Sequence, residues 1–354
     1  MAKEAAERKG EAESSVPLVE LSAPSLHEWE RKLAPYLAEL LARLLGARDA
    51  FSALRWCGYE IVLADGTTVT RPGAKGTTAR VLYAMRLADM TLLKCLVTDE
   101  HGGESLRVFE VSPGQLWICD RNYSNPVGIA WVTNAGGDLL VRYNRGTLPL
   151  YDAGGRHFDV MEHVRCLQTP EETKEWSVWA HLEGREPLEG RLCAVRLSEE
   201  HAEKARQWLR REYGSKVTPE SLEAAAWMMV FTTASRDRLP LQQALDLYRL
   251  RWQMELEIKR EKSIGGLGNL PNFRDDTIAT WLYAKLLIQQ IARKIVSPAV
   301  AFPPSAVGSA ALAASSGGPR EAAPHHAEGR RRDVARHGAG VRSDSRRAPP
   351  HRAA

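Results

Sequence analysis

Two short apolar segments that each close on an aspartate constrain the fold of this chain more than any other feature. They are I-V-L-A-D at 61–65 and L-W-I-C-D at 116–120. Apolar runs of this length, bounded by turn residues, are typical of strands buried in a sheet that is covered on both faces. The sequence therefore predicts an α/β fold in which Asp65 and Asp120 stand at the ends of buried strands, where a rigid sheet can present their side chains.

The segments around these runs alternate between strand and helix patterns. Three strand-like runs come first, then a short helix, the run that ends at Asp120, a longer helix and a further strand, at 60–67, 79–87, 91–99, 105–112, 115–120, 125–136 and 138–144. Gly102 and Gly103 favour a hairpin after the third strand. This order predicts a mixed sheet flanked by helices.

Composition divides the chain into three parts. Residues 1–50 are predicted to form a charged leader and a helix from Pro24 to Leu45, which Pro35 kinks or splits in two. Residues 51–296 form the main domain. Within it, about 145–230 carries short strand signals, including one at H-F-D-V, and a charged helix.

The tail at 297–354 is rich in Ala, Gly, Pro, Ser and Arg, and we predict that it is disordered because it cannot bury enough apolar surface. The formal net charge of the chain is +4, but the tail holds nine of the 48 basic residues and four of the 44 acidic ones. Residues 1–296 are therefore almost neutral. The tail is interpreted as a non-homologous end, with a basic DNA-binding arm as the alternative.

Neither a membrane nor a secreted location is indicated. No apolar run is long enough to cross a bilayer, and the N-terminus lacks the apolar stretch of a secretion signal. The five cysteines include no C-x-x-C pair, which argues against a zinc ribbon and a disulfide framework. We expect a cytoplasmic protein.

A stripe of polar residues marks the segment 240–262, which is predicted to be one long helix. Tyr248, Arg251, Glu255, Lys259 and Lys262 fall on one face at 100° per residue, over about 21 Å. Such a stripe suits a carboxylate flanked by groups that hold successive phosphates. The alternative is a solvated face with weak ion pairs from Glu255 to Arg251 and Lys259.

Asp65, Asp120 and Glu255 together predict a site for two divalent ions, Mg²⁺ or Mn²⁺, because these ions prefer carboxylate oxygens. Each residue also has an ordinary explanation. Asp65 precedes a glycine, as in many hairpin turns. Asp120 could pair with Arg121, or cap the helix that starts near Asn125.

The spacing Y-x-x-R-x-x-x-E-x-x-x-x-x-x-K, filled by Tyr248, Arg251, Glu255 and Lys262, resembles the Tyr-Arg-Glu-Lys signature of the bacterial insertion-sequence-four transposases. V-L-A-D-G-T-T-V-T-R-P-G and I-C-D-R-N-Y-S resemble the other two acidic blocks of that family. The resemblance covers about 24–296. It implies an RNase H-like catalytic domain at 51–296, with a β-rich insertion at about 145–230 before the catalytic-glutamate helix.

The same resemblance implies a role for each matched residue. Asp65, Asp120 and Glu255 would hold the metal ions, whereas Tyr248, Arg251 and Lys262 would contact the DNA backbone, with Arg121 and Lys259 as further candidates. The implied reaction is DNA cleavage at transposon ends and strand transfer into target DNA. The implied partners are the terminal repeats, the target DNA and a second copy in a synaptic complex, in the bacterial nucleoid.

Both ends of the chain depart from the family pattern. The N-terminal helical region is short and the sequence from Ser297 is atypical, so we expect a truncated or frameshifted copy. The alternatives are a non-catalytic DNA-binding remnant and a metal-dependent nuclease without strand transfer. Glu104 resembles a further family position, although a glutamate in a turn is usually only solvated.

Overall fold

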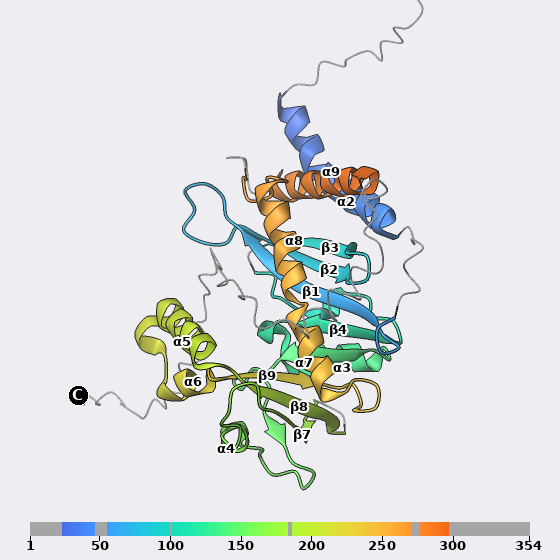
Figure 1. Cartoon of the computed structure of the whole chain (residues 1–354). Helices are drawn as coiled ribbons and strands as arrows, with labels where there is room; N and C mark the ends of the chain where they lie inside the picture. Colours follow the sequence, from blue (N-terminus) through green and yellow to red (C-terminus); the bar gives the residue numbers. More distant parts are fainter. Residues whose placement is uncertain (1–22, 47–54, 100, 183–185, 271–276, 297–354) are drawn as a thin grey trace, which may run out of the picture. The chain divides into compact units, whose positions relative to one another are not determined.

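The computed structural model describes residues 23–46, 55–99, 101–182, 186–270 and 277–296. The predicted leader (up to residue 22) and the predicted disordered tail lie outside these residues. Figure 1 shows a large twisted sheet with helices on its faces. Among the described residues, no helix has both the length and the apolar character needed to span a membrane.

The strands of the described residues form one sheet in the order β3-β2-β1-β4-β5-β9-β8-β7-β6. Their bounds are Glu60–Val69 (β1), Ala79–Arg86 (β2), Thr91–Asp99 (β3), Gln115–Cys119 (β4), Asp138–Arg142 (β5), Leu150–Tyr151 (β6), Thr173–Ala180 (β7), Leu188–Arg196 (β8) and Trp227–Thr232 (β9). β4 runs parallel to β1 and to β5, while the other pairs are antiparallel. The predicted mixed α/β class is confirmed.

The helices begin and end where local chemistry favours it. Asn125 caps α3 through Gly128 N and Pro126 occupies the first turn, while Ser198 caps α5. The helices are Ala23–Gly46 (α2), Pro126–Asn134 (α3), Val160–Val164 (α4), Glu199–Tyr213 (α5), Pro219–Ala224 (α6), Leu241–Arg249 (α7), Trp252–Ser263 (α8) and Ile278–Val296 (α9), with 3₁₀ turns at Leu106–Val108 (η2), Arg121–Tyr123 (η3) and Gly214–Lys216 (η4).

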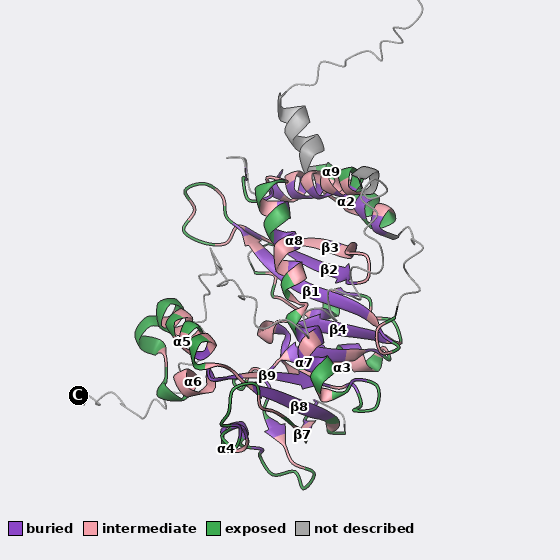
Figure 2. Ribbon diagram, in the orientation of Figure 1, coloured by how far each residue is buried: buried purple, intermediate pink, exposed green. Residues whose placement is uncertain are grey.

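Two hydrophobic cores lie on opposite faces of the sheet. Ile61 and Leu63 of β1 belong to the core that includes residues of α2, α7, α8 and α9, whereas Val62 and Ala64 belong to the core that includes α3. The alternation follows from the two-residue period of a strand. Because both faces are covered, β1, β2 and β4 are almost entirely buried, whereas most residues of β3 and β7 are not, as Figure 2 shows.

At two places where the sequence favours a hairpin, none forms. β1 does not end at Asp65 but continues to Val69, because Gly66–Val69 pairs in antiparallel register with Ala79–Leu82 of β2. A partner strand thus outweighs the turn preference of Asp-Gly. Nor does a hairpin follow β3: that strand lies at the edge of the sheet, and the next element is η2.

The segment at 145–230 extends the same sheet. β9, which we did not predict, joins β5 on one side and β8 on the other, so the predicted boundary at 230 falls inside a strand. The predicted strand at H-F-D-V is wrong, because Asp159 instead caps α4.

The predicted long helix at 240–262 is two helices, α7 and α8, joined by a two-residue turn at Leu250 and Arg251. In that turn the backbone N–H of Leu250 donates to Leu247 O, and that of Arg251 to Tyr248 O. Each of these hydrogen bonds joins residues three positions apart, as in a 3₁₀ helix, so the backbone is wound more tightly here than in an α-helix. Near the other end of the chain, Pro35 lies inside α2, which is assigned as one helix rather than two.

Candidate active site

Asp65 and Asp120 lie side by side on neighbouring strands. The parallel register pairs Ala64 of β1 with Cys119 of β4, so the two aspartates follow at the next position of each strand. By strand alternation Asp65 shares the face of Leu63, which is the face covered by α7 and α8. Asp65 is only 3% exposed.

Backbone amides orient both carboxylates. Gly66 N donates to Asp65 Oδ1 at 2.7 Å, and Asn122 N donates to Asp120 Oδ1 at 2.6 Å. Asp120 thereby caps the 3₁₀ turn η3, and not the helix that begins after Asn125.

Arg251 connects Asp65 to Glu255. Its Nη1 lies 3.6 Å from Asp65 Oδ2, and its Nη2 donates to Glu255 Oε1. Burial alone would lower the pKa of Arg251, but Tyr248, Asp65, Glu255 and Asp120 together raise it. The guanidinium therefore stays charged, and it holds Glu255 of α8 beside the strand carboxylates.

Tyr248 precedes the turn between α7 and α8 and is buried, with its ring centroid 6.0 Å from the Arg251 guanidinium carbon. Burial raises the pKa of the Tyr248 phenol, against the opposing effect of Arg251 and Arg142. The helix break changes the predicted geometry. Tyr248 lies on α7 and Glu255 on α8, so the stripe does not run along a single straight helix.

Sequence reasoning missed Arg142, the last residue of β5. Cys119 pairs with Val141, so Arg142 aligns with Asp120 across the parallel strands. Burial, together with the charges of Arg121 and Arg251, lowers the pKa of Arg142, while Tyr248 and Asp120 raise it. D-L-L-V-R is a third apolar run that ends on a charged residue, after those ending at Asp65 and Asp120. This pattern is the sequence signal that could have revealed Arg142.

The other predicted cations lie around the cluster formed by Asp65, Asp120, Arg251 and Glu255. Lys262 Nζ donates to Thr68 O of β1 at 2.9 Å. Lys259 is exposed on α8. Arg121, directly after Asp120, donates from Nη2 to the Tyr213 hydroxyl of α5 at 3.0 Å. Thus Arg121 ties the η3 turn to a helix of the 145–230 segment.

Glu104 is not merely solvated, which corrects the expectation from its place in a turn. Its side chain is 9% exposed and its Oε2 accepts a hydrogen bond from Asn122 Nδ2 at 2.7 Å. Glu104 thus joins the surroundings of Asp120.

Within the ranges that the structure describes, no group of three or more His, Cys, Asp or Glu side chains is gathered closely enough to hold a metal ion. The ion pair of Arg251 with Asp65 and Glu255 shows one reason, since a guanidinium connects two of the three predicted ligands. The residues nevertheless supply hard oxygen donors from two strands and one helix, which is the chemistry that Mg²⁺ or Mn²⁺ requires.

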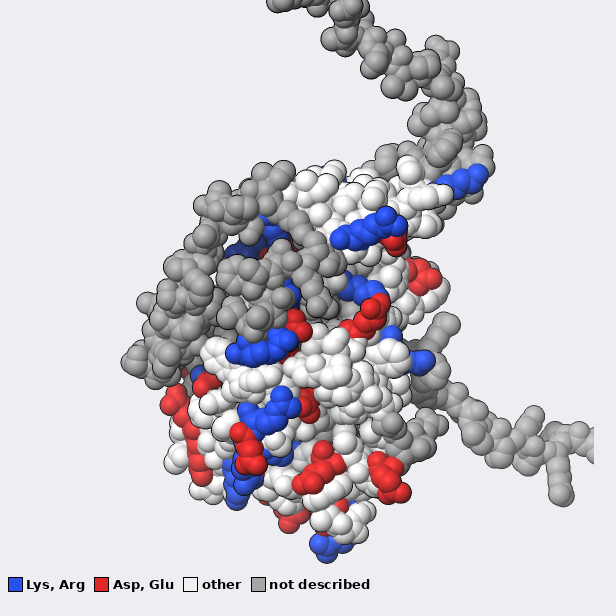
Figure 3. All heavy atoms as spheres, turned by 90° about the vertical axis from the view of Figure 1, so that its right-hand side faces the viewer, with Lys and Arg blue, Asp and Glu red and all other residues white. Residues whose placement is uncertain are grey.

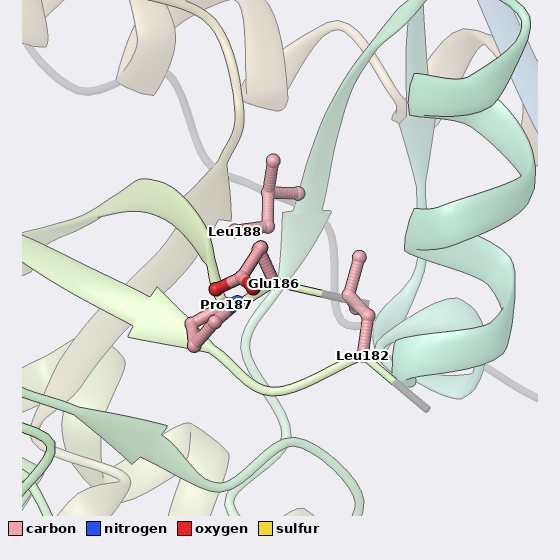
Figure 4. A pocket seen from close by; sticks show the side chains of 4 residues that line it. All are labelled: Leu182, Glu186, Pro187 and Leu188. Carbon is pink, nitrogen blue, oxygen red and sulfur yellow. The ribbon is translucent and has the colours of Figure 1, made fainter. Parts of the chain in front are cut away.

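One face of the described surface and a pocket beside β8 add no residue to this candidate site. On the face seen in Figure 3, cationic and anionic side chains of the described residues are interspersed and form no single basic field. A pocket beside β8 is lined by Leu182, Glu186, Pro187 and Leu188, as Figure 4 shows, and none of the predicted site residues lines it.

Comparison with known proteins identifies relatives at the level of sequence. The chain is 30% identical over 296 residues to the transposase InsL for insertion sequence element IS186A of Escherichia coli strain K12, which covers 82% of this chain and 80% of that protein. The match to the transposase for insertion sequence element IS421 of Escherichia coli has the same identity and coverage. The transposase for IS231F of Bacillus thuringiensis subsp. israelensis is 29% identical over 193 residues, which are 49% of this chain and 40% of that protein.

No family model matches the chain. Among solved structures, a piggyBac transposase synaptic complex with hairpin DNA aligns over 84% of this chain and 64% of that chain, with 8% sequence identity and a TM-score of 0.34. A likeness at that level is too low to support a conclusion about fold or function.

Proposed function

The chain belongs to the family of insertion-sequence transposases that includes those of IS186 and IS421, and we propose that it cleaves DNA at transposon ends and transfers the strands into target DNA. The observation that carries this proposal is the placement of Asp65 and Asp120 at adjacent positions of parallel strands, with Glu255 joined to Asp65 through Arg251.

The topology supports an RNase H-like core of the insertion-sequence-four type. Three antiparallel strands, β1 to β3, are followed by β4 and β5, which extend the sheet in parallel from β1. In the sequence, β6 to β9 lie between β5 and α7, where the family resemblance predicts an insertion. In the sheet, they continue outward from β5. The acidic residues then come from β1, the end of β4 and α8.

The donor set fits two divalent ions. Asp65, Asp120 and Glu255 would hold them through their carboxylate oxygens. When bound, such ions activate the attacking oxygen and stabilise the leaving oxygen of a phosphoryl displacement. The residues of the chain orient the carboxylates: Gly66 and Asn122 through their amides, and Arg251 through its guanidinium.

The surrounding hydrogen-bond donors would hold DNA. Tyr248, Arg251, Lys259, Lys262 and Arg121 offer a phenol, two guanidinium forks and two ammonium groups around the carboxylates, and phosphate oxygens accept from all of these donors. Arg142 adds a further positive charge in line with Asp120. We propose terminal repeats and target DNA as the ligands, held by a homodimer in a synaptic complex.

The decisive experiment is nicking of plasmid DNA by the purified protein with Mg²⁺ or Mn²⁺, beside the Glu255→Gln variant. The matched control is Asp246→Asn, because Asp246 is an acidic residue of α7 that contacts Gln242 and Arg249. Metal-dependent nicking by the parent and the control, but not by Glu255→Gln, is expected. Equal nicking by all three would contradict the site.

A second assay on the same proteins separates the alternatives. Joining of a cleaved transposon end to target plasmid distinguishes a transposase from a nuclease, which would nick without joining. DNA binding with no nicking by folded parent protein would identify a non-catalytic remnant.

A further inference from the structure

The place of Glu104 beside β1 depends on a glycine. Glu104 lies in the irregular segment between β3 and η2, yet its carboxylate is largely buried. A Cβ built on Gly66 would come within 3.3 Å of Glu104 Cγ and Oε1, and within 2.8 Å of Leu82 Cδ2. Gly66, directly after Asp65, therefore leaves the space in which the Glu104 carboxylate sits.

Two hydrogen bonds link Glu104 to Asp120. Asn122 Nδ2 donates to Glu104 Oε2 at 2.7 Å, and the backbone N–H of the same asparagine donates to Asp120 Oδ1 at 2.6 Å. Asn122 is the middle residue of the three-residue turn η3, which has no longer helix to stabilise it. Through the side chain of Asn122, a residue outside the turn can therefore fix the backbone N–H that orients Asp120.

The charge of Glu104 is only partly balanced by its neighbours. Its contact with Arg80 is long, at 3.9 Å from Nη1 to Oε1. The hydroxyl of Tyr123, the last residue of η3, is buried and makes no hydrogen bond within the described structure. Burial raises the pKa of Tyr123, and the charges of Glu104, Asp65 and Asp120 raise it further, so the three carboxylates share one environment.

We propose that Glu104 is a positioning residue for Asp120, which it holds through Asn122 in a fixed orientation at the end of β4, where the carboxylate would bind a divalent ion. This inference rests on the proposed function. It assigns Glu104 no contact with metal or DNA. Partners of ligating carboxylates commonly change metal affinity or activity by about 10- to 100-fold when they are removed, and an effect of that size is expected here.

The experiment compares Glu104→Ala, Glu104→Gln and Asn122→Ala with Glu110→Gln. Glu110 is the matched control because it lies six residues along the same connection and is 96% exposed. Two quantities are measured: the Mg²⁺ concentration that gives half-maximal plasmid nicking, and the affinity of the DNA-free protein for Mn²⁺ by electron paramagnetic resonance. The second does not depend on activity.

Glu104→Ala and Asn122→Ala are each expected to raise the half-maximal Mg²⁺ concentration and the Mn²⁺ dissociation constant by about tenfold. Their double variant should be no worse than either alone, since both break one chain of contacts. Glu104→Gln should stay within about threefold of the parent, because its amide oxygen can still accept from Asn122. Glu110→Gln should match the parent.

A Glu104→Gln variant as impaired as Glu104→Ala overturns the proposal, because the charge and not the hydrogen bond would then matter. Parent-like values for Asn122→Ala also overturn it. If Glu104→Ala does not fold, Asn122→Ala decides, since it keeps the backbone N–H that binds Asp120. Absence of metal-dependent nicking in the folded parent instead overturns the proposed function itself, and this inference with it.

Discussion

Two glutamates two residues apart on α8 have opposite environments. Glu255 is 23% exposed and shares Arg251 with Asp65 of the central sheet. Glu257 is 2% exposed and forms an ion pair with Arg293 of α9, whose Nη1 also donates to Met90 O at 2.9 Å. One glutamate faces the strand ends that carry Asp65 and Asp120, and the other faces α9.

The difference follows from helix geometry. Residues two positions apart are rotated by about 200° around the helix axis, so Glu255 and Glu257 point to nearly opposite sides of α8. Glu261, four positions after Glu257, is rotated from it by only about 40°. Glu257 and Glu261 line a cavity of about 390 Å³ together with residues of α9. One face of α8 is therefore available for chemistry, while the other fastens the helix to α9. The residue type alone does not distinguish the two roles.

The largest expected effect separates the two glutamates by activity. Glu255→Gln should lower metal-dependent nicking on the order of 10³-fold, since an ion that loses a ligand loses several kcal/mol of transition-state stabilisation. Its melting temperature should stay close to that of the parent, because Glu255 is partly exposed. Nicking assays and thermal unfolding of the same preparations measure both. A variant that loses activity only because it unfolds would remove the contrast.

The next effect concerns stability. Arg293→Ala should destabilise the fold by about 3 kcal/mol, the lower end for a broken buried ion pair, because it leaves the buried Glu257 carboxylate with only the half-exposed Arg260 at 3.5 Å. Denaturant unfolding measures the change. Arg43→Ala is the control, because Arg43 pairs with Glu39 on an exposed surface of α2 and should leave stability nearly unchanged. Equal stability of both variants would mean that α9 does not fasten α8.

A smaller effect is expected in the pH dependence. Burial raises the pKa of Glu261 to about 7, from 4.5 for a free side chain. The folded state therefore keeps its proton where the unfolded state has lost it, so stability should fall as pH rises from about 4.5 to 7 and level off above. The loss is on the order of 2 to 3 kcal/mol.

The control is the Glu261→Gln variant, whose amide does not titrate. Its stability should therefore not fall between about pH 4.5 and pH 7 through ionisation at position 261. Urea unfolding of parent and variant at several values between pH 5 and pH 8 gives the difference directly. Parallel stability curves for the two proteins would show that Glu261 titrates normally.

The smallest expected effect concerns DNA binding. Arg251→Ala and Lys262→Ala should each weaken binding and lower the slope of log K against log salt by about one, because each would remove one phosphate contact. Binding is measured at several salt concentrations without metal, so that cleavage does not interfere. Arg156→Ala, which removes an exposed cation paired with Asp152, is the control. An unchanged slope in both site variants would remove their role as phosphate ligands.

Much of the fold follows from patterns that are local in the chain. The apolar runs of β2, β3, β4 and β5 lie where their sequence predicts them, and α5 is the charged helix predicted within 145–230. β9 escaped prediction, since W-M-M-V-F-T follows α6 closely and carries no alternation of polar residues. Its strand conformation depends on the pairing with β5 and β8, which lie far away in sequence.

The candidate site was predictable in its residues but not in its arrangement. Asp65, Asp120 and Glu255 were found from apolar runs and spacing. The turn at Leu250 and Arg251, which directs Arg251 to Asp65, was not visible in a pattern that suits one continuous helix. Arg142 and Glu104 were missed as members of the cluster, because their importance lies in neighbours supplied by other strands and turns.

The sequence by itself determined the α/β class and the order of most elements, and it supplied the three candidate carboxylates, because these depend on local periodicity and residue chemistry. Only the tertiary structure decided that β1 runs on past Asp65, that Arg251 stands between Asp65 and Glu255, and that Glu104 reaches Asp120 through Asn122. The physical reason is that strand pairing and buried charge depend on partners distant in the chain, whose contacts outweigh local preference.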